Sequence, residues 1–309
     1  MMHTALPHLS MLLSVAFWSS SATAIKFILP VIPVFEAVAF RFTIAATFLW
    51  IVVLATSQLR HLRTLGWQPF IAGIIDPGII AVMAYVALTM TTAVHAVVIM
   101  STMPIFASIF GRIFLKEPLT LPVTGGSLIG LAGTAVLVSD TAMGSKATLI
   151  GDGLMVSAVL LICFAQLVLR RVARDRGHPL LMTALMITGG ALSGYIALGM
   201  FGEATPLAWT GEANTAVWLT FLYTGTFISA AAFFFYNFAL RHIQMGRLSL
   251  YSVLQTPLGI ALAAIVLGES ISTVEGAGIV LVIIGVSLPA LSNFLKAHGR
   301  EQTAPPPQV

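Results

Sequence analysis

The sequence contains very little charge. Only 8% of its 309 residues are Asp, Glu, Lys or Arg, against 58% hydrophobic residues, and the mean hydropathy is +0.98. So few charges cannot cover a globular surface in contact with water, which excludes an ordinary soluble domain. The single cysteine, Cys163, excludes an intramolecular disulfide framework. No Lys or Arg precedes the first apolar run, and many similar runs follow it, so we interpret it as a membrane span and not as a signal peptide.

Motifs for catalysis and for nucleotide binding are also missing. Gly125-Gly126 is not followed by the Gly-Lys-Ser/Thr pattern of a phosphate-binding loop, so we do not expect ATP to drive this protein. The histidines (residues 3, 8, 61, 95, 178, 242 and 298) lie at the ends of apolar runs or outside them, and Asp76 has no second Asp at membrane depth. Neither an intramembrane Ser–His pair nor an Asp pair is therefore indicated. We expect no catalytic residue, no metal site and no cofactor.

Apolar runs long enough to cross a bilayer make up most of the chain, since a membrane helix needs about 20 apolar residues. Prolines or charges separate these runs. The pattern predicts an all-α integral membrane protein whose ten transmembrane helices occupy residues 6–29, 33–56, 67–90, 94–115, 121–139, 149–169, 179–200, 214–240, 246–267 and 272–294. The tail at 296–309 ends in three consecutive prolines and is expected to be disordered.

The positive residues favour one side of the membrane. If the N-terminus is cytoplasmic, most of the 15 Lys and Arg residues fall in cytoplasmic segments. We therefore expect a multi-pass protein of the inner (plasma) membrane with both termini in the cytoplasm. The same bias explains the net charge of +4 as a topology signal, so no nucleic-acid partner is expected.

The stretch Gly73–Ser139 occurs twice in the sequence. Shifted by 152 positions it falls on Gly225–Leu291, so that Gly73 meets Gly225 and Glu117 meets Glu269. Five spans per copy is an odd number, so the second copy should enter the membrane upside down. Inverted repeats around a central cavity are the architecture of alternating-access carriers. We assign residues 1–140 and 141–295 to the two five-helix repeats. Pro104 and Pro257 match one residue out of step, which predicts a small compensating slip between the copies.

These residues resemble the EamA-type family of the drug/metabolite transporter superfamily. The resemblance rests on Trp18-Ser19-Ser20-Ser21, Arg41-Phe42 and the repeated Gly…Ala-Leu…Pro…Glu…Gly…Gly pattern, and it covers nearly all of 6–294. It implies a ten-helix inverted-repeat carrier with a central cavity lined by both halves and the fifth and tenth spans at the side. Family members of similar length export amino acids and other small metabolites. The superfamily's small multidrug carriers bind cations and protons with a Glu in the first helix. Span one here has no acidic residue, which argues against an exporter of simple quaternary cations.

Two charges at membrane depth are candidates for function, because burying a charge in the bilayer is costly. At about 1.5 Å per residue, Arg41 and Asp76 both reach the middle of the membrane. We expect them to face each other or a shared wet cavity, either as a structural ion pair or as groups that bind substrate or a proton. Glu117 and Glu269 are expected to cap the helix that follows each of them.

Aromatic rings and deep polar groups complete the set of predicted binding residues. The aromatic candidates for binding apolar parts of a substrate are Trp18, Phe42, Tyr85, Tyr223 and Tyr236. For each of them the alternative role is packing in the core or facing lipid. The polar candidates are His95, Gln166 and Gln255, and proton coupling would use Asp76 or, second, His95. Pro77, Pro104 and Pro257 interrupt their helices as hinges or as static kinks.

The combined features predict a secondary transporter that exports small metabolites by alternating access, most readily amino acids, including aromatic or apolar ones. A sugar-nucleotide or organic-phosphate exchanger is the alternative carrier, although it would need several cationic groups in the cavity and only Arg41 and Lys26 are available. An intramembrane enzyme is the alternative from another class. The expected partners are the lipid bilayer and a small-molecule substrate. The GxxxG step at Gly126 and Gly130 favours packing within a monomer, with a dimer as the alternative.

Overall fold

The computed structural model describes residues 2–28, 30–90, 99–100, 102–137, 149–202, 207–267 and 273–303. Within these ranges the chain forms helical stretches that correspond to the ten predicted spans. In chain order they are α1 (Met2–Ser19) with α2 (Ser21–Ile28); α3 (Val34–Ala55); α5 (Gln68–Gly73), the π-helical η2 (Ile74–Ile79) and α6 (Ile80–Met90); α8 (Met103–Leu115); α9 (Leu121–Leu137); α10 (Leu149–Arg176); α11 (Pro179–Phe201); α12 (Thr215–Tyr223), the π-helical η5 (Thr224–Ala231) and α13 (Ala232–His242); α14 (Met245–Ser252) with α15 (Gln255–Leu267); and α16 (Thr273–Thr303).

Length and apolar composition support a membrane location for these helices. Four described helices are long and apolar enough to cross a bilayer, or five if the bent pair Gln58–Leu65 and Gln68–Ala84 counts as one span. Shorter apolar helices lie at Ala5–Ser19, Met103–Leu115, Leu121–Val136 and Gly276–Pro289. The connections between them include η1 (Gln58–His61), α4 (Leu62–Leu65) and η4 (Ala208–Gly211).

The two halves repeat in secondary structure as well as in sequence. The π-helical segments η2 and η5 end at counterpart residues, and α6 and α13 begin directly after them. Further along, α8 begins at Met103 and α15 at its counterpart, Gln255. The predicted slip near Pro104 and Pro257 is therefore wrong. The helices stay in step, and the two prolines occupy successive positions in the first turn of matching helices.

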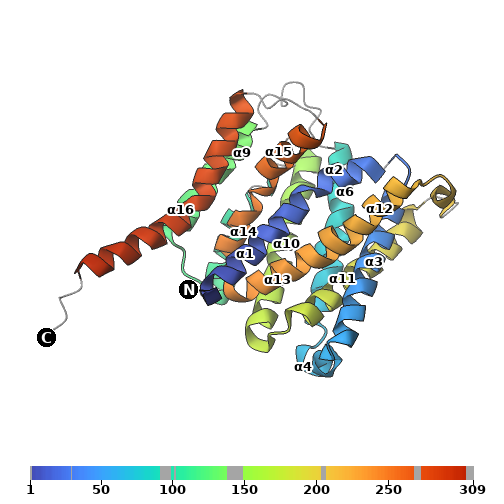
Figure 1. Ribbon diagram of the computed structural model, residues 1–309, viewed down its shortest axis with the longest axis horizontal. Helices are drawn as coiled ribbons and strands as arrows, with labels where there is room; N and C mark the ends of the chain where they lie inside the picture. The colour runs from blue at the N-terminus through green and yellow to red at the C-terminus, as the bar shows by residue number, and fades with distance from the viewer. Residues whose placement is uncertain are drawn as a thin grey trace.

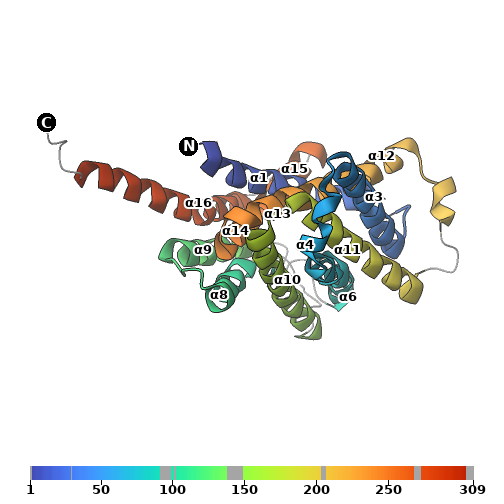
Figure 2. The same cartoon turned by 90° about the horizontal axis from the view of Figure 1, so that it is seen from below.

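Helix packing follows the same repeat. The contact of α1 with α13 matches that of α10 with α6, and the contact of α3 with η5 matches that of α11 with α5 and η2. Three pairs from corresponding spans also pack on each other directly: α3 with α11, α8 with α14, and α9 with α16. Figures 1 and 2 show the α9–α16 pair at one side of the bundle and the α3–α11 pair at the other.

The paired helices α9 and α16 run in opposite directions. Gly126 of α9 faces Gly285 of α16, while Gly133 further along α9 faces the earlier Gly278. A Cβ on Gly126 or on Gly285 would overlap the carbonyl oxygen of the other, so glycine is needed for this close approach. The small-residue face of α9 thus packs against α16 of the same chain.

The pair α3 and α11 is antiparallel in the same way. Trp50 Nε1 donates a hydrogen bond to Thr188 Oγ1 (2.9 Å), and Thr43 Oγ1, earlier in α3, donates to the hydroxyl of Tyr195, later in α11 (3.1 Å). Counterpart helices that run in opposite directions are what an inverted repeat requires. The predicted all-α architecture of two inverted five-helix repeats is confirmed.

The C-terminal helix is longer than the sequence indicates. α16 continues to Thr303, beyond the membrane span and into the tail that we expected to be disordered. Residues 296–303 contain no proline, and their Lys, Arg, Glu and Gln residues are good helix formers, so the helix can continue in a polar environment. In Figure 1 this part of α16 projects away from the bundle. Residues 304–309 lie outside the described ranges.

Candidate functional site

Asp76 lies where the third span is interrupted. Its backbone angles (φ −127°, ψ 112°) are not helical, and a cis peptide bond joins it to Pro77. Proline has no N–H to donate, so the helical hydrogen bonds cannot continue regularly here. The neighbouring helix α11 supplies a substitute, because Ser193 Oγ donates a hydrogen bond to the carbonyl oxygen of Ile74 (3.0 Å). The break that sets the direction of the Asp76 side chain is therefore supported by tertiary contacts.

Two buried side chains from other spans interact electrostatically with Asp76. Tyr236 of α13 and Cys163 of α10 both lie within electrostatic reach of its carboxylate, and they are 3% and 0% exposed. The Tyr236 hydroxyl has no hydrogen-bond partner within the described residues. The Tyr236 ring packs against Trp18 of α1, with 5.3 Å between ring centroids. We call Trp18, Asp76, Cys163 and Tyr236 the Asp76 cluster; its members come from spans one, three, six and eight, on α1, η2, α10 and α13.

The structure does not bring Arg41 and Asp76 together. Among the described residues neither an ion pair nor an electrostatic interaction links the two charges. The reason is the position of α11, which packs against α3 on one side and against α5 and η2 on the other. The Arg41 guanidinium instead lies 4.7 Å from the centroid of the neighbouring Phe42 ring. Phe42 itself is 0% exposed and packs in the main hydrophobic core in this conformation.

Two other predicted residues connect spans to one another. The Tyr223 and Ser20 hydroxyls are 2.8 Å apart at the break between α1 and α2. Gln166 of α10 accepts a hydrogen bond from Ser249 Oγ of α14 (3.2 Å), and its amide nitrogen is 3.7 Å from Met103 Sδ of α8. These contacts place both side chains between helices.

For the remaining predicted site residues, the structure gives only the position in a helix, or does not describe the residue or its side chain. Gln255 and Pro257 lie in the first turn of α15, just after the interruption that separates it from α14, and Pro104 lies in the first turn of α8. His95 and the side chain of Tyr85 lie outside what the structure describes. The three prolines therefore all stand at interruptions, as the hinge prediction requires, and their movement stays a prediction.

A buried ion pair closes one end of the bundle. Arg170 Nε and Glu117 Oε1 are 3.1 Å apart, with side chains 7% and 9% exposed. Glu117 Oε2 also accepts the backbone N–H of Met245 (2.9 Å), and Arg170 Nη1 donates to the carbonyl oxygen of Leu240. These four residues, here named the Glu117 clasp, link the segment that follows α8 to α10, α13 and α14.

The clasp corrects the expected role of Glu117. It caps α14, far along the chain, and not the following helix α9. Lys116 adopts a left-handed conformation (φ 57°) that ends α8 and redirects the chain, so the Glu117 side chain lies against α14. Sequence reasoning missed Arg170, because it stands in a basic run (Arg170, Arg171, Arg174 and Arg176) that was interpreted only as a topology signal. Glu269 lies outside the described residues.

Comparisons with known proteins agree with this fold. The chain matches the model of the EamA-like transporter family over residues 5–139 and 149–290. It is 25% identical over 275 residues to the uncharacterized transporter YyaM of Bacillus subtilis (strain 168), which covers 87% of this chain and 88% of that protein. A crystal structure with 20% sequence identity superimposes with a TM-score of 0.80 over 93% of this chain and 96% of the other, a likeness that concerns the fold alone.

Proposed function

This chain belongs to the EamA-like transporter family, and from that premise we propose that it exports amino acids by alternating access, binding them at the Asp76 cluster. One observation carries the proposal: a carboxylate at a helix break and a buried hydroxyl without a partner lie beside aromatic rings, inside an otherwise apolar bundle. Unpaired polar groups at membrane depth are costly, so such groups mark functional sites in membrane proteins.

The chemistry of the cluster suits a zwitterion with an apolar side chain. The Asp76 carboxylate can pair with the substrate ammonium group, and the Tyr236 hydroxyl can donate a hydrogen bond to the substrate carboxylate. The Trp18 ring offers a face for an apolar or aromatic side chain or for the ammonium group itself. Because the Tyr236 hydroxyl lacks a partner within the described residues, a ligand that accepts its hydrogen bond and also pairs with the Asp76 carboxylate would be favoured over one that does neither.

The repeats and the clasp provide a mechanism for exposing this site to either side in turn. Two inverted repeats, 1–140 and 141–295, can exchange their arrangements by rocking, which opens the site first to one side and then to the other. The interruptions at Pro77, Pro104 and Pro257 are where helices can bend. The Glu117 clasp joins helices of both repeats, so it has to separate when the bundle opens at that end. With the positive residues assigned to the cytoplasm, this is the cytoplasmic end of a carrier in the inner membrane, with both termini cytoplasmic.

Uptake of radiolabelled amino acids into proteoliposomes tests the proposal. Wild type is compared with Asp76→Asn, which keeps the side-chain shape, and with Asp175→Asn, the same change at an exposed position near the end of α10. We expect uptake above empty liposomes for wild type and Asp175→Asn, and uptake near the empty-liposome level for Asp76→Asn. Stimulation of wild type and Asp175→Asn by a proton gradient would show that transport is coupled to protons.

Two outcomes would contradict the proposal. Equal uptake by wild type and Asp76→Asn would remove Asp76 from the site and leave the carrier assignment intact. Failure of wild type to take up any amino acid, while phosphorylated metabolites are taken up, would replace the amino-acid substrate by the organic-phosphate alternative.

A further inference from the structure

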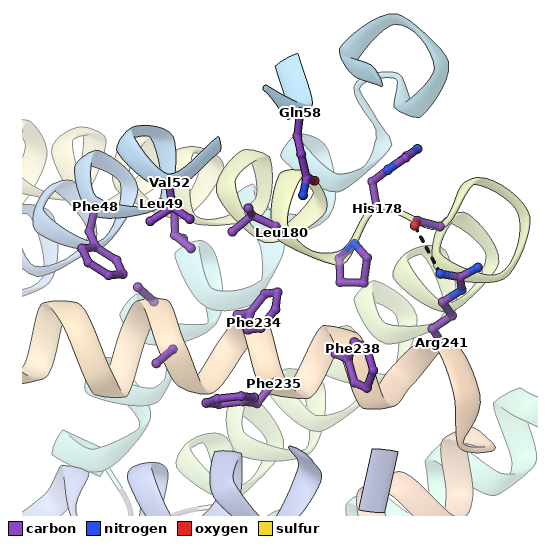
Figure 3. Close-up of a pocket in the computed structure, with 14 residues that line it drawn as sticks. Phe48, Leu49, Val52, Gln58, His178, Leu180, Phe234, Phe235, Phe238 and Arg241 are labelled. Carbon is purple, nitrogen blue, oxygen red and sulfur yellow. Dashed lines mark hydrogen bonds between the residues drawn. The ribbon is translucent and has the colours of Figure 1, made fainter. Parts of the chain in front are cut away.

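A cavity of about 500 Å³ lies between α3, η5, α13 and the start of α11, and no member of the Asp76 cluster lines it (Figure 3). Phe48 on its wall is 44% exposed, so the cavity opens on the outer face of the bundle. We call it the α3–α13 groove. Its walls are apolar, built mainly from Phe48, Leu49, Val52, Phe234, Phe235 and Phe238. In a membrane protein this face is where lipid chains reach, and the volume falls within the range of about 300–1,000 Å³ that is typical of ligand sites.

One end of the groove is basic. Arg241, in the last turn of α13, donates one hydrogen bond through Nη1 to the carbonyl oxygen of Gly177 (3.3 Å), and its side chain is exposed. His178 also lines this end, and its ring stacks on that of His61 with 4.0 Å between centroids. Arg60 Nε donates to His61 Nε2 (3.1 Å), which places a second guanidinium beside the histidine pair. Figure 3 shows Gln58, His178 and Arg241 together at this end, with Phe48 and Leu49 at the other.

The charge at the basic end is carried by the arginines. Partial burial, followed by the nearby His61, Arg241 and Arg60, lowers the pKa of His178 below its ordinary value. His178 is therefore mostly neutral at pH 7. Among the described residues that line the groove none carries a carboxylate, so an anion here would meet no acid on the groove wall.

We propose that the α3–α13 groove binds an anionic phospholipid, with an acyl chain along the phenylalanine wall and the headgroup phosphate between Arg241 and Arg60. A guanidinium group fits a phosphate through two parallel hydrogen bonds, and Arg241 uses only one of its donors in the contact with Gly177. The groove is apolar along its length and cationic at one end, which matches the apolar acyl chain and the anionic headgroup of a phospholipid. The occupant belongs to the leaflet at the arginine-rich end of the bundle. The site requires only that the chain span a membrane and does not depend on the transported substrate.

Native mass spectrometry of the full chain in detergent tests this site. The delipidated protein is offered equal amounts of phosphatidylglycerol and phosphatidylcholine with the same acyl chains. We expect wild type to retain phosphatidylglycerol preferentially, and Arg241→Gln to reduce that preference about fivefold, the effect of one basic residue near an anionic lipid surface. Arg241→Lys should keep most of the preference. Arg112→Gln, the same charge change on the exposed face of α8, should leave it unchanged.

Further variants distinguish a bound lipid from a free anion and from a general loss of charge. Ala231→Phe should fill the groove without changing its charge and lower retention of both lipids. If Arg241→Gln folds poorly, Arg60→Gln probes the same phosphate from the other side and should reduce the preference similarly. Equal retention of the two lipids by wild type, or equal losses in Arg241→Gln and Arg112→Gln, would overturn the proposal. Displacement of the lipid by glycerol phosphate at an equal concentration would also overturn it, because the site would then be for a free anion.

Discussion

The π-helical segments η2 and η5 occupy equivalent places in the two repeats but differ in chemistry. Where η2 carries Asp76 and Pro77, η5 carries Ile228 and Ser229, which are 3% and 1% exposed. The backbone irregularity is thus present twice, whereas the carboxylate is present once. Irregular turns of this kind within helices often mark functional sites. The comparison teaches that the repeat reproduces the backbone geometry, whereas the carboxylate and the proline belong to the first copy alone.

The glycines that precede or begin the two segments also differ in what they contact. A Cβ on Gly73 would overlap the backbone carbonyl of Met186 in α11, whereas a Cβ on Gly225 would meet the side chain of Ile44 in α3, 2.6 Å from its Cγ2. The overlap at Gly225 is the milder one, because rotation of Ile44 and a small shift of α3 relieve it, whereas the overlap at Gly73 is with the backbone itself. The first repeat is therefore the more tightly constrained of the two at this point.

Giving η5 the charge of η2 should produce the largest effect. We expect Ile228→Asp to lower the free energy of unfolding by about 2.5–3.5 kcal/mol, because the carboxylate would lie at membrane depth without a partner. Ile228→Asn has nearly the same shape without the charge and serves as the control. Thermal unfolding of both variants in detergent measures the difference. If the two were equally stable, η5 would be as accessible to water as η2 and the comparison would fail.

The second prediction sharpens the difference between the two glycines. We expect Gly73→Ala to lower the free energy of unfolding by about 3 kcal/mol and Gly225→Ala by about 1 kcal/mol, the two ends of the usual range for overpacking. The Gly73 variant would overlap the Met186 backbone directly, whereas the Gly225 variant would need Ile44 to turn and α3 to shift slightly, because Ile44 Cβ is 2.8 Å away. The same unfolding assay checks both. A larger loss for Gly225→Ala would reverse the order of constraint inferred from the structure.

The smallest effect on stability is expected for a substitution of Tyr236, whose side chain lies near Asp76 of η2. Tyr236→Phe removes a buried hydroxyl that has no partner among the described residues, so stability should stay unchanged or rise slightly. Uptake should nevertheless weaken, with an increase in KM of about fivefold for the loss of one hydrogen bond to the substrate. Unchanged KM would mean that the hydroxyl does not contact the substrate.

Much of the fold follows from local patterns. Apolar runs and their breaks predict the helices, and the recurrence of Gly73 as Gly225 predicts the repeat whose counterpart helices pack together. Asp76 stands out without any structure, because a charge inside an apolar run is conspicuous. The pairing of Glu117 with Arg170, 53 residues away, could not be predicted, and neither could the separation of Arg41 from Asp76 by α11.

The sequence by itself determined the all-α membrane architecture, the inverted repeat and the presence of a carboxylate in the third span. Each of these depends on hydrophobicity, charge and spacing along the chain. Only the tertiary structure decided that Trp18 and Tyr236 lie beside each other near Asp76, that Phe42 packs in the core, and that Glu117 caps α14. Side chains on different helices meet according to crossing angles and close contacts between helices, and helical periodicity alone carries no information about those.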